Sequence, residues 1–281
     1  MHELQNLLSF EFVRHALAAG LLASILCGVV GTFVVVKRLV FISGGISHAA
    51  FGGLGLCHFL GVDYRLGAGA VAVGSALALS GTGRGRGRSH DAVIGILWAV
   101  GMAVGIVFLH LTPGYAPNLQ TYLFGNILTV TARDVWLTFG LVAALLALLA
   151  LFWKELVAVA FDEAFAAVQG VPVRLALGGL MVAIALAVVF LIQLVGALLV
   201  IALLTIPPAI ALRLVDGFFA VMVAATVAGA LMTVGGLAVS YAFDLPSGPA
   251  IVLLGAALLL LAEGRQRLRR RLARSSRSRN P

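Results

Sequence analysis

A single histidine, His48, lies in the middle of an apolar segment rich in glycine, alanine and serine, FISGGISHAAFGGLGL at residues 41–56. Imidazole is a good ligand for transition metals, and it is costly to leave facing lipid. Small side chains let helix backbones approach each other closely inside a membrane bundle. The pattern predicts a helix in the interior of such a bundle, with His48, Ser47 and Ser43 along the path of a polar cargo.

Two interpretations of His48 stay open at this point. In the first, the imidazole contacts a metal ion or forms part of a gate. In the second, it is hydrogen-bonded to a neighbouring helix and serves only the structure. The surrounding serines and glycines have the same two interpretations, because close helix packing explains them as well as contact with a passing ion does. We expect the functional interpretation of His48, although one histidine cannot hold a divalent ion by itself.

The composition is that of a membrane protein. The chain has 281 residues, of which 62% are hydrophobic and 11% are charged, whereas soluble domains carry roughly 25% charged residues. A helix crosses the ~30 Å hydrocarbon layer with about 20 residues. Charge-free stretches of that order run over 15–36, 39–62, 66–83, 92–132, 135–153, 175–212, 217–243 and 245–262. We therefore expect an all-α, polytopic integral membrane protein.

Two of these stretches are too long for one span. We expect 175–212 to turn back near Gln193. We expect 92–132 to hold one span up to Leu111, after which Pro113 and Pro117 break the helix and residues 121–130 form a short helix at the membrane face. The prediction is then about nine transmembrane helices, with eight as the alternative.

The basic residues favour an orientation with the N-terminus outside and the C-terminus inside, because Lys and Arg gather in cytoplasmic segments. Arg14, Arg65 and Arg133 then fall outside, whereas the basic residues at 37, 38, 84, 86, 88, 154, 174 and 213 and those of the tail fall inside. In this orientation Asn118 and Asp244 lie in outer loops, where they either line the outer mouth of a path or are merely solvated.

The charge distribution also suggests a division of the chain. We expect residues 1–263 to form a transmembrane domain, and residues 264–281 to form an Arg-rich cytoplasmic tail that is disordered. Basic residues next to a membrane span bind anionic lipid surfaces. Membrane lipid, rather than nucleic acid, is therefore the expected partner of the tail.

The sequence carries no enzyme motif: it contains no GxxxxGK[ST], HExxH, GxSxG or CxxC pattern. Proton- and ion-coupled carriers place carboxylates or basic residues within their spans, but the acids of this chain fall near the expected span ends. We therefore expect a transporter without catalytic residues whose energy comes from another protein. An autonomous channel or secondary carrier is the alternative.

Two segments on the expected cytoplasmic side are suited to receive that energy. The first begins with acids, which favour the N-terminus of a helix, and ends at glycine and proline. The second contains a proline pair that we expect to break a span. A short amphipathic helix suits docking into a groove of a soluble partner, although a helix that merely joins two spans has the same shape. Their candidate coupling residues are Asp162, Glu163, Ala164 and Gly170 in the first segment, and Pro207, Pro208, Arg213 and Asp216 in the second.

Several longer segments resemble one family. They are KRLVFISGGISHAAFGGLGL (37–56), LFGNILTVT (123–131), FDEAFAAVQGVPV (161–173), VGALLVIALLTIPPAIALRL (195–214) and YAFDLPSGPAIVLL (241–254). Because of these segments and the order in which they occur, the chain resembles the membrane permease subunit of ATP-binding-cassette importers for zinc, manganese or iron. That family is distantly similar to the cobalamin and siderophore permeases.

The resemblance implies a multi-pass protein of the bacterial or archaeal cell (inner) membrane that acts as a homodimer. Its implied partners are cytoplasmic ATP-binding-cassette ATPase subunits and an extracytoplasmic metal-binding protein. The divalent metal ion would be the transported substrate, and no cofactor would be bound permanently. The implied mechanism is alternating access around His48, and a permease for a metal chelate is the alternative within the class.

The resemblance also bears on individual residues. Residues 162–170 look like the Glu-Ala-Ala…Gly loop of importers, and 206–216 fall where cobalamin-type permeases contact their ATPase. We expect the second to be the principal coupling element, with the first beside it. Many family members carry an acid four residues before the histidine, on the same helix face, whereas this chain has Gly44 at that position.

Overall fold

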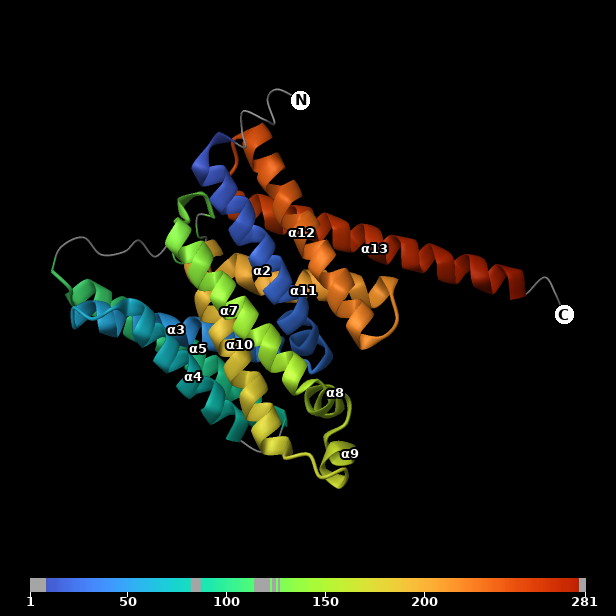
Figure 1. The fold of residues 1–281 in the computed structure, drawn as a ribbon, viewed down its shortest axis with the longest axis horizontal. Helices are drawn as coiled ribbons and strands as arrows, with labels where there is room; N and C mark the ends of the chain where they lie inside the picture. Colours follow the sequence, from blue (N-terminus) through green and yellow to red (C-terminus); the bar gives the residue numbers. More distant parts are fainter. Residues whose placement is uncertain (1–8, 82–86, 114–121, 123–124, 126, 278–281) are drawn as a thin grey trace.

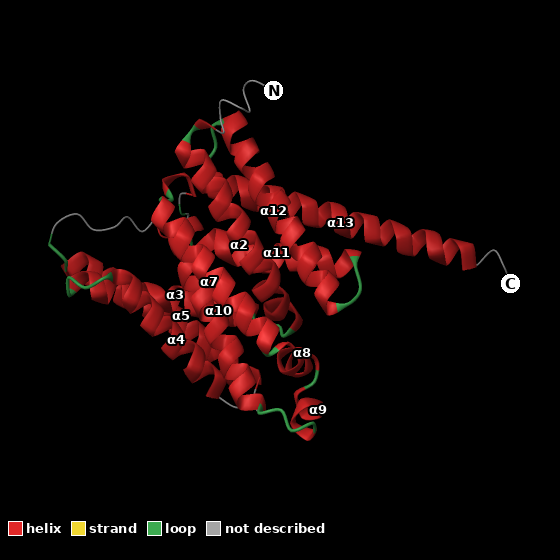
Figure 2. Cartoon of the chain, viewed as in Figure 1, coloured by secondary structure: helices red, strands yellow, loops and turns green. Residues whose placement is uncertain are grey.

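The chain folds into a bundle of helices (Figure 1), and Figure 2 shows loops only as short connections between them. The structure, a computed structural model, describes residues 9–81, 87–113, 122, 125 and 127–277. Within these residues there is no strand, and the predicted all-α fold is confirmed.

The long helices follow the predicted spans in order. They are α2 (Glu11–Val36), α3 (Val40–Phe59), α4 (Tyr64–Gly81), α5 (Gly87–Leu111), α7 (Ala132–Leu151), α10 (Val173–Val195), α11 (Ala197–Leu214), α12 (Phe218–Phe243) and α13 (Ser247–Arg277). The short ones are the 3-10 helix η1 (Ile127–Thr129), α8 (Trp153–Phe161) and α9 (Glu163–Val168). In the described part of the chain, 8 helices are long and apolar enough to cross a membrane. The 18-residue helix α4 coincides with the further predicted span and packs against α3 and α10.

Helix α2 runs through the middle of the bundle (Figure 1), where it packs against α7, α10, α11 and α12. Close contact with its neighbours requires glycine. A Cβ added at Gly28 would lie 2.6 Å from the backbone nitrogen of Thr226 on α12.

Helices α3, α4 and α5 form a second closely packed group. A Cβ added at Gly52 of α3 would lie 2.9 Å from the carbonyl oxygen of Gly101 on α5, and one added at Gly53 would lie 2.2 Å from that of Gly67 on α4. Small residues let the backbones meet. The packing interpretation is therefore confirmed for these glycines of the segment 41–56.

The prediction that the proline pair breaks a span is wrong. Pro207 and Pro208 lie buried inside α11, which continues to Leu214. Proline lacks the N–H that would bond to the carbonyl four residues earlier, so Pro208 leaves the carbonyl of Leu204 free of its usual partner. Gly31 of α2 lies against that carbonyl, and a Cβ at Gly31 would be 2.6 Å from its oxygen. Membrane helices tolerate proline where a neighbouring helix covers the freed backbone group in this way.

The segment that leads into α7, where we predict a short helix at the membrane face, contains the 3-10 helix η1. Ile127 is buried, and η1 packs against α2. A Cβ added at Gly125 (φ 63°) would lie 2.3 Å from the carbonyl carbon of Val195, beside Gly196 (φ 83°), which separates α10 from α11 close to the predicted turn at Gln193. Irregular backbone is tolerated at membrane depth where protein surrounds it. Residues 114–121 lie outside the described residues.

The residues from 264 onward also differ from the prediction. Helix α13 continues to Arg277 where we expected a disordered tail, and its C-terminal half extends away from the other helices (Figure 1). Arg, Leu, Ala and Gln all have high helix propensity. The guanidinium of Arg267 also pairs with Glu263 one turn earlier, at 2.7 Å, a spacing that supports a helix.

Candidate functional site

His48 lies buried in the middle of α3, as predicted, and its ring stacks on Trp98 of α5. The ring centroids are 4.2 Å apart and the interplanar angle is 13°. Trp98 itself is 39% exposed in the single chain. No pattern in the sequence points to Trp98, because an aromatic residue in an apolar span is usually part of the core.

Trp98 also covers Gly44, the position at which the family resemblance leads us to expect an acid. A Cβ added at Gly44 would lie 3.4 Å from Cζ3 of Trp98, which is van der Waals contact with the edge of the ring. Gly44 and His48 lie one turn apart on α3, so the indole spans both positions. A hydrophobic ring therefore stands where a second metal ligand would be expected.

The two serines differ in their surroundings. The Ser43 hydroxyl donates to the carbonyl of Val40 at 2.8 Å, which is a local contact within α3. Ser47 is buried, and its carbonyl accepts a hydrogen bond from the Tyr122 hydroxyl at 2.9 Å. Tyr122 also packs against Phe51, with ring centroids 4.7 Å apart.

Two buried polar atoms lie side by side in sequence at this point. Among the described residues, Oγ of Ser47 and Nδ1 of His48 have no hydrogen-bond partner. A buried polar group without a partner is uncommon and calls for an explanation. The described residues bring no three His, Cys, Asp or Glu side chains together, so within this part of the chain His48 contributes one imidazole and belongs to no three-ligand set.

The predicted helix at 162–170 is confirmed. Asp162 is the N-cap of α9, and its carboxylate accepts from the backbone N–H groups of Ala164 at 2.9 Å and Phe165 at 3.0 Å. Gly170 (φ 84°) follows the helix in a conformation that disfavours other residues. Asp162, Ala164 and Gly170 are exposed. Glu163, in contrast, turns inward and forms an ion pair with Lys37, the C-cap of α2.

The structure brings the two predicted coupling segments to the same end of the bundle, which we call the α9 end. Phe218 follows Asp216 at the start of α12, and its ring lies 5.6 Å from that of Phe161 and 6.0 Å from that of Trp153, both on α8. The ring centroid of Phe33 on α2 lies 4.8 Å from that of Phe218. These aromatic contacts tie α2, α8 and α12 together.

The second coupling segment is only partly accessible. Pro207 and Pro208 are buried in α11, whereas Asp216 is exposed and Arg213 is partly exposed. The guanidinium of Arg213 donates to the carbonyl of Ala209 at 2.5 Å, near the C-terminus of the same helix. Cations stabilise helix C-termini in this way.

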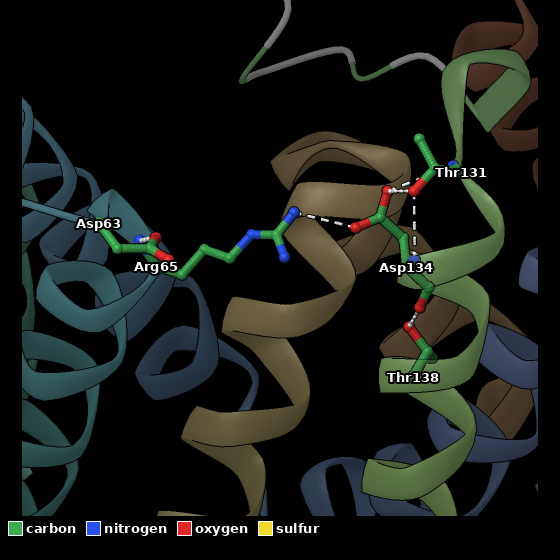
Figure 3. A network of polar contacts seen from close by, with 5 residues as sticks. All are labelled: Asp63, Arg65, Thr131, Asp134 and Thr138. Carbon is green, nitrogen blue, oxygen red and sulfur yellow. Dashed lines mark hydrogen bonds and ion pairs between the residues drawn. The ribbon is translucent and has the colours of Figure 1, made fainter.

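A polar network joins the N-terminus of α4 to the N-terminus of α7 (Figure 3). Arg65 donates to Asp134 at 2.9 Å, and Asp134 in turn forms a capping box with Thr131 at the N-terminus of α7. Asp134 is thus both a helix cap and one partner of an ion pair between helices. Neither role was predicted.

Of the residues predicted for the outer mouth, Asp244 is an exposed C-cap of α12 with φ 51°, and Asn118 lies outside the described residues.

Replacing Asp134 by alanine should lower the stability of the folded protein by about 1–2 kcal/mol, because the change removes a helix cap and a partly buried ion pair together. Thermal unfolding of the purified protein in detergent measures the effect. Asp216→Ala, which removes an exposed carboxylate from the α9 end, is the matched control and should change the unfolding temperature little. Equal shifts in the two variants would contradict the prediction.

Comparison with known proteins assigns the family. A model of the ABC 3 transport family matches residues 9–265. The chain is 42% identical over 255 residues to an uncharacterized membrane protein of Synechocystis sp., with 91% of each protein covered. It is 32% identical over 257 residues to the manganese transport system membrane protein MntC of Halalkalibacterium halodurans, covering 92% of this chain and 88% of MntC.

A solved structure agrees with this assignment. A chain in the structure of PsaBC from Streptococcus pneumoniae in complex with Fab is 31% identical in sequence, with 92% of this chain and 93% of that chain covered and a TM-score of 0.82. The fold, the sequence and the family model therefore agree over nearly the whole length. The protein belongs to the ABC 3 transport family, the metal-importer permeases that its sequence resembles.

Proposed function

We propose that this protein is the membrane-spanning subunit of an importer that moves a divalent transition metal inward by alternating access, powered by a separate ATPase. The observation that carries the proposal is His48, whose buried Nδ1 has no partner among the described residues. An unpartnered imidazole nitrogen in the middle of a membrane helix is suited to a passing metal ion. A single donor binds weakly, which suits a path that must release its cargo.

Manganese is the first cargo to test. The relative from Halalkalibacterium halodurans is named as a membrane protein of a manganese transport system and matches over most of both chains. Imidazole also suits zinc and iron, and affinity alone does not select among these metals. Zinc and iron are therefore the competing cargoes, and a metal chelate is the alternative within the class.

The proposed active form is a homodimer. Helix α5 exposes apolar side chains along its length in the single chain, among them Ile96, Val100 and Val107, and Trp98 is partly exposed on the same helix. In a dimer with α5 at the interface, each copy would contribute one His48. Two imidazoles facing one path would give the metal more than one donor, which the single chain does not.

The ATPase would dock at the α9 end, which is then the cytoplasmic end. Helix α9 presents apolar side chains there: Val168 is 88% exposed, and Phe165 is exposed beside it. Exposed apolar side chains on a short helix are suited to a groove of a partner protein. Because Pro207 and Pro208 are buried, we favour α9 over 206–216 as the principal contact, with Asp216 at its side. An extracytoplasmic metal-binding protein would deliver the cargo at the opposite end.

The proposal is tested by uptake of radioactive manganese, zinc and iron into proteoliposomes. The vesicles contain this protein with its ATPase and metal-binding protein, with ATP or a non-hydrolysable analogue inside. ATP-dependent accumulation of a metal is the expected result. Metal entry that does not depend on ATP would favour the channel or carrier. ATP hydrolysis without entry of any free metal would favour a chelate as the cargo.

A further inference from the structure

One lysine side chain connects three helices at the α9 end. Lys37 is the C-cap of α2, and its ammonium donates to the carbonyl of Val159 in the last turn of α8 at 2.8 Å. The same ammonium pairs with the carboxylate of Glu163, the first residue of α9. Lys37 therefore holds the joint between α8 and α9 against the end of α2.

This contact differs from an ordinary surface ion pair. The Lys37 and Glu163 side chains are only 11% and 10% exposed, whereas those of Arg267 and Glu263, a pair within α13, are 74% and 35% exposed. Removing one partner of a buried pair leaves the other charge buried without compensation, whereas exposed pairs contribute little. The Lys37–Glu163 pair is therefore a constraint that resists separation.

Lys37 also lies directly before the turn that begins α3. Arg38 adopts a left-handed backbone conformation (φ 57°), and the N–H of Leu39 bonds to the carbonyl of Val34 at 2.7 Å. The side chain of Leu39 is buried. The turn is therefore held by the contacts of Lys37 before it and by the packing of Leu39 after it. A displacement of Lys37 must then pass into α3, where His48 lies about 12 Å along the helix from Val40.

We propose that the Lys37–Glu163 pair is the link by which movement of α9 reaches the helix that carries His48. Lys37 and Glu163 are positioning residues in this scheme, and neither touches the metal. The inference rests on the proposed function, in which α9 contacts the ATPase. It also changes the role expected for Glu163: the exposed residues of α9 receive the ATPase, and Glu163 passes their movement inward.

The test measures manganese uptake and ATP hydrolysis in the same proteoliposomes, made with the ATPase and the metal-binding protein. In Glu163→Gln, hydrolysis should stay within about twofold of the wild type while uptake per ATP falls about tenfold, a typical size for coupling between sites. Lys37→Met should have the same effect. Lys37→Arg keeps a cation with several donors and should retain most of the uptake per ATP. Glu263→Gln removes the exposed pair in α13 and should change neither quantity.

A double variant distinguishes a direct link between Lys37 and Glu163 from two independent defects. If the two residues act as one unit, combining Lys37→Met with Glu163→Gln should lower uptake per ATP little further than either change alone. Retention of the ATPase on the affinity-tagged permease shows that the complex still assembles. Additive losses, unchanged uptake per ATP in Glu163→Gln, or loss of the ATPase from that variant would each overturn the inference. Absence of ATP-dependent uptake in the wild type would instead overturn the proposed function.

Discussion

Manganese uptake by the reconstituted complex should fall at least about tenfold when His48 is replaced by alanine. Removing even an outer-shell partner of a metal ligand typically costs about 10- to 100-fold in affinity or activity, so losing the ligand itself should cost at least as much. The substitution removes the imidazole from the path and leaves the side chain of Trp98 unsubstituted. Uptake is measured with ATP and saturating metal-binding protein, and ATP hydrolysis is followed in the same vesicles.

The matched control for this prediction is His58→Ala. His58 lies on the same helix, in its last turn, and is only partly buried. It should therefore be replaceable with little loss of uptake. The structural interpretation of His48 predicts a different pattern, in which His48→Ala lowers the unfolding temperature and the yield of assembled complex while each remaining complex transports normally. That result would remove His48 from the path.

Replacing Gly101 by alanine should destabilise the packing of α3 against α5. The added Cβ would lie 2.5 Å from Cα of Ala49 and 2.8 Å from the carbonyl oxygen of His48. Both neighbours are backbone atoms, so no side chain can rotate to make room and the helices must separate. Overpacking of this kind costs about 1–3 kcal/mol. Separation would also move Trp98, on the same helix, away from His48, so we expect a lower unfolding temperature together with reduced uptake.

Gly95 provides a control on the same helix. A Cβ added there meets nothing within 4 Å, and alanine is a better helix former than glycine by about 1 kcal/mol. Gly95→Ala should therefore leave the unfolding temperature unchanged or raise it. If Gly101→Ala and Gly95→Ala behaved alike, close contact between α3 and α5 would not be the reason that glycine is needed at Gly101.

The elements of the fold that the sequence predicts are those that depend on local rules. Span length and the absence of charge locate the long helices, and acids followed by glycine locate α9. Local rules fail where a neighbouring helix decides the outcome. Pro208 does not end α11, because Gly31 of α2 covers the carbonyl that proline leaves unpaired. The burial of Ile127 likewise depends on a neighbouring helix, because η1 packs against α2.

The candidate site was predictable only in part. His48 stands out in the sequence because a histidine in an apolar segment is rare. Its partner Trp98 comes from another helix, and nothing in the order of residues joins the two. The Lys37–Glu163 pair is likewise invisible in the sequence, since the two residues lie 126 positions apart. The sequence pattern predicts Glu163 as a surface contact, whereas its side chain is almost completely buried.

The contacts within the α3, α4 and α5 group have a mechanical consequence. Gly52 and Gly53 place the backbone of α3 directly against the backbones of Gly101 and Gly67. Contacts between side chains can adjust by changing rotamers, but contacts between backbones have no rotamers to change. Such an interface either keeps its alignment or slides as a whole. The three helices should therefore tilt as one rigid block, with His48 and Trp98 carried together inside it rather than parted during the cycle.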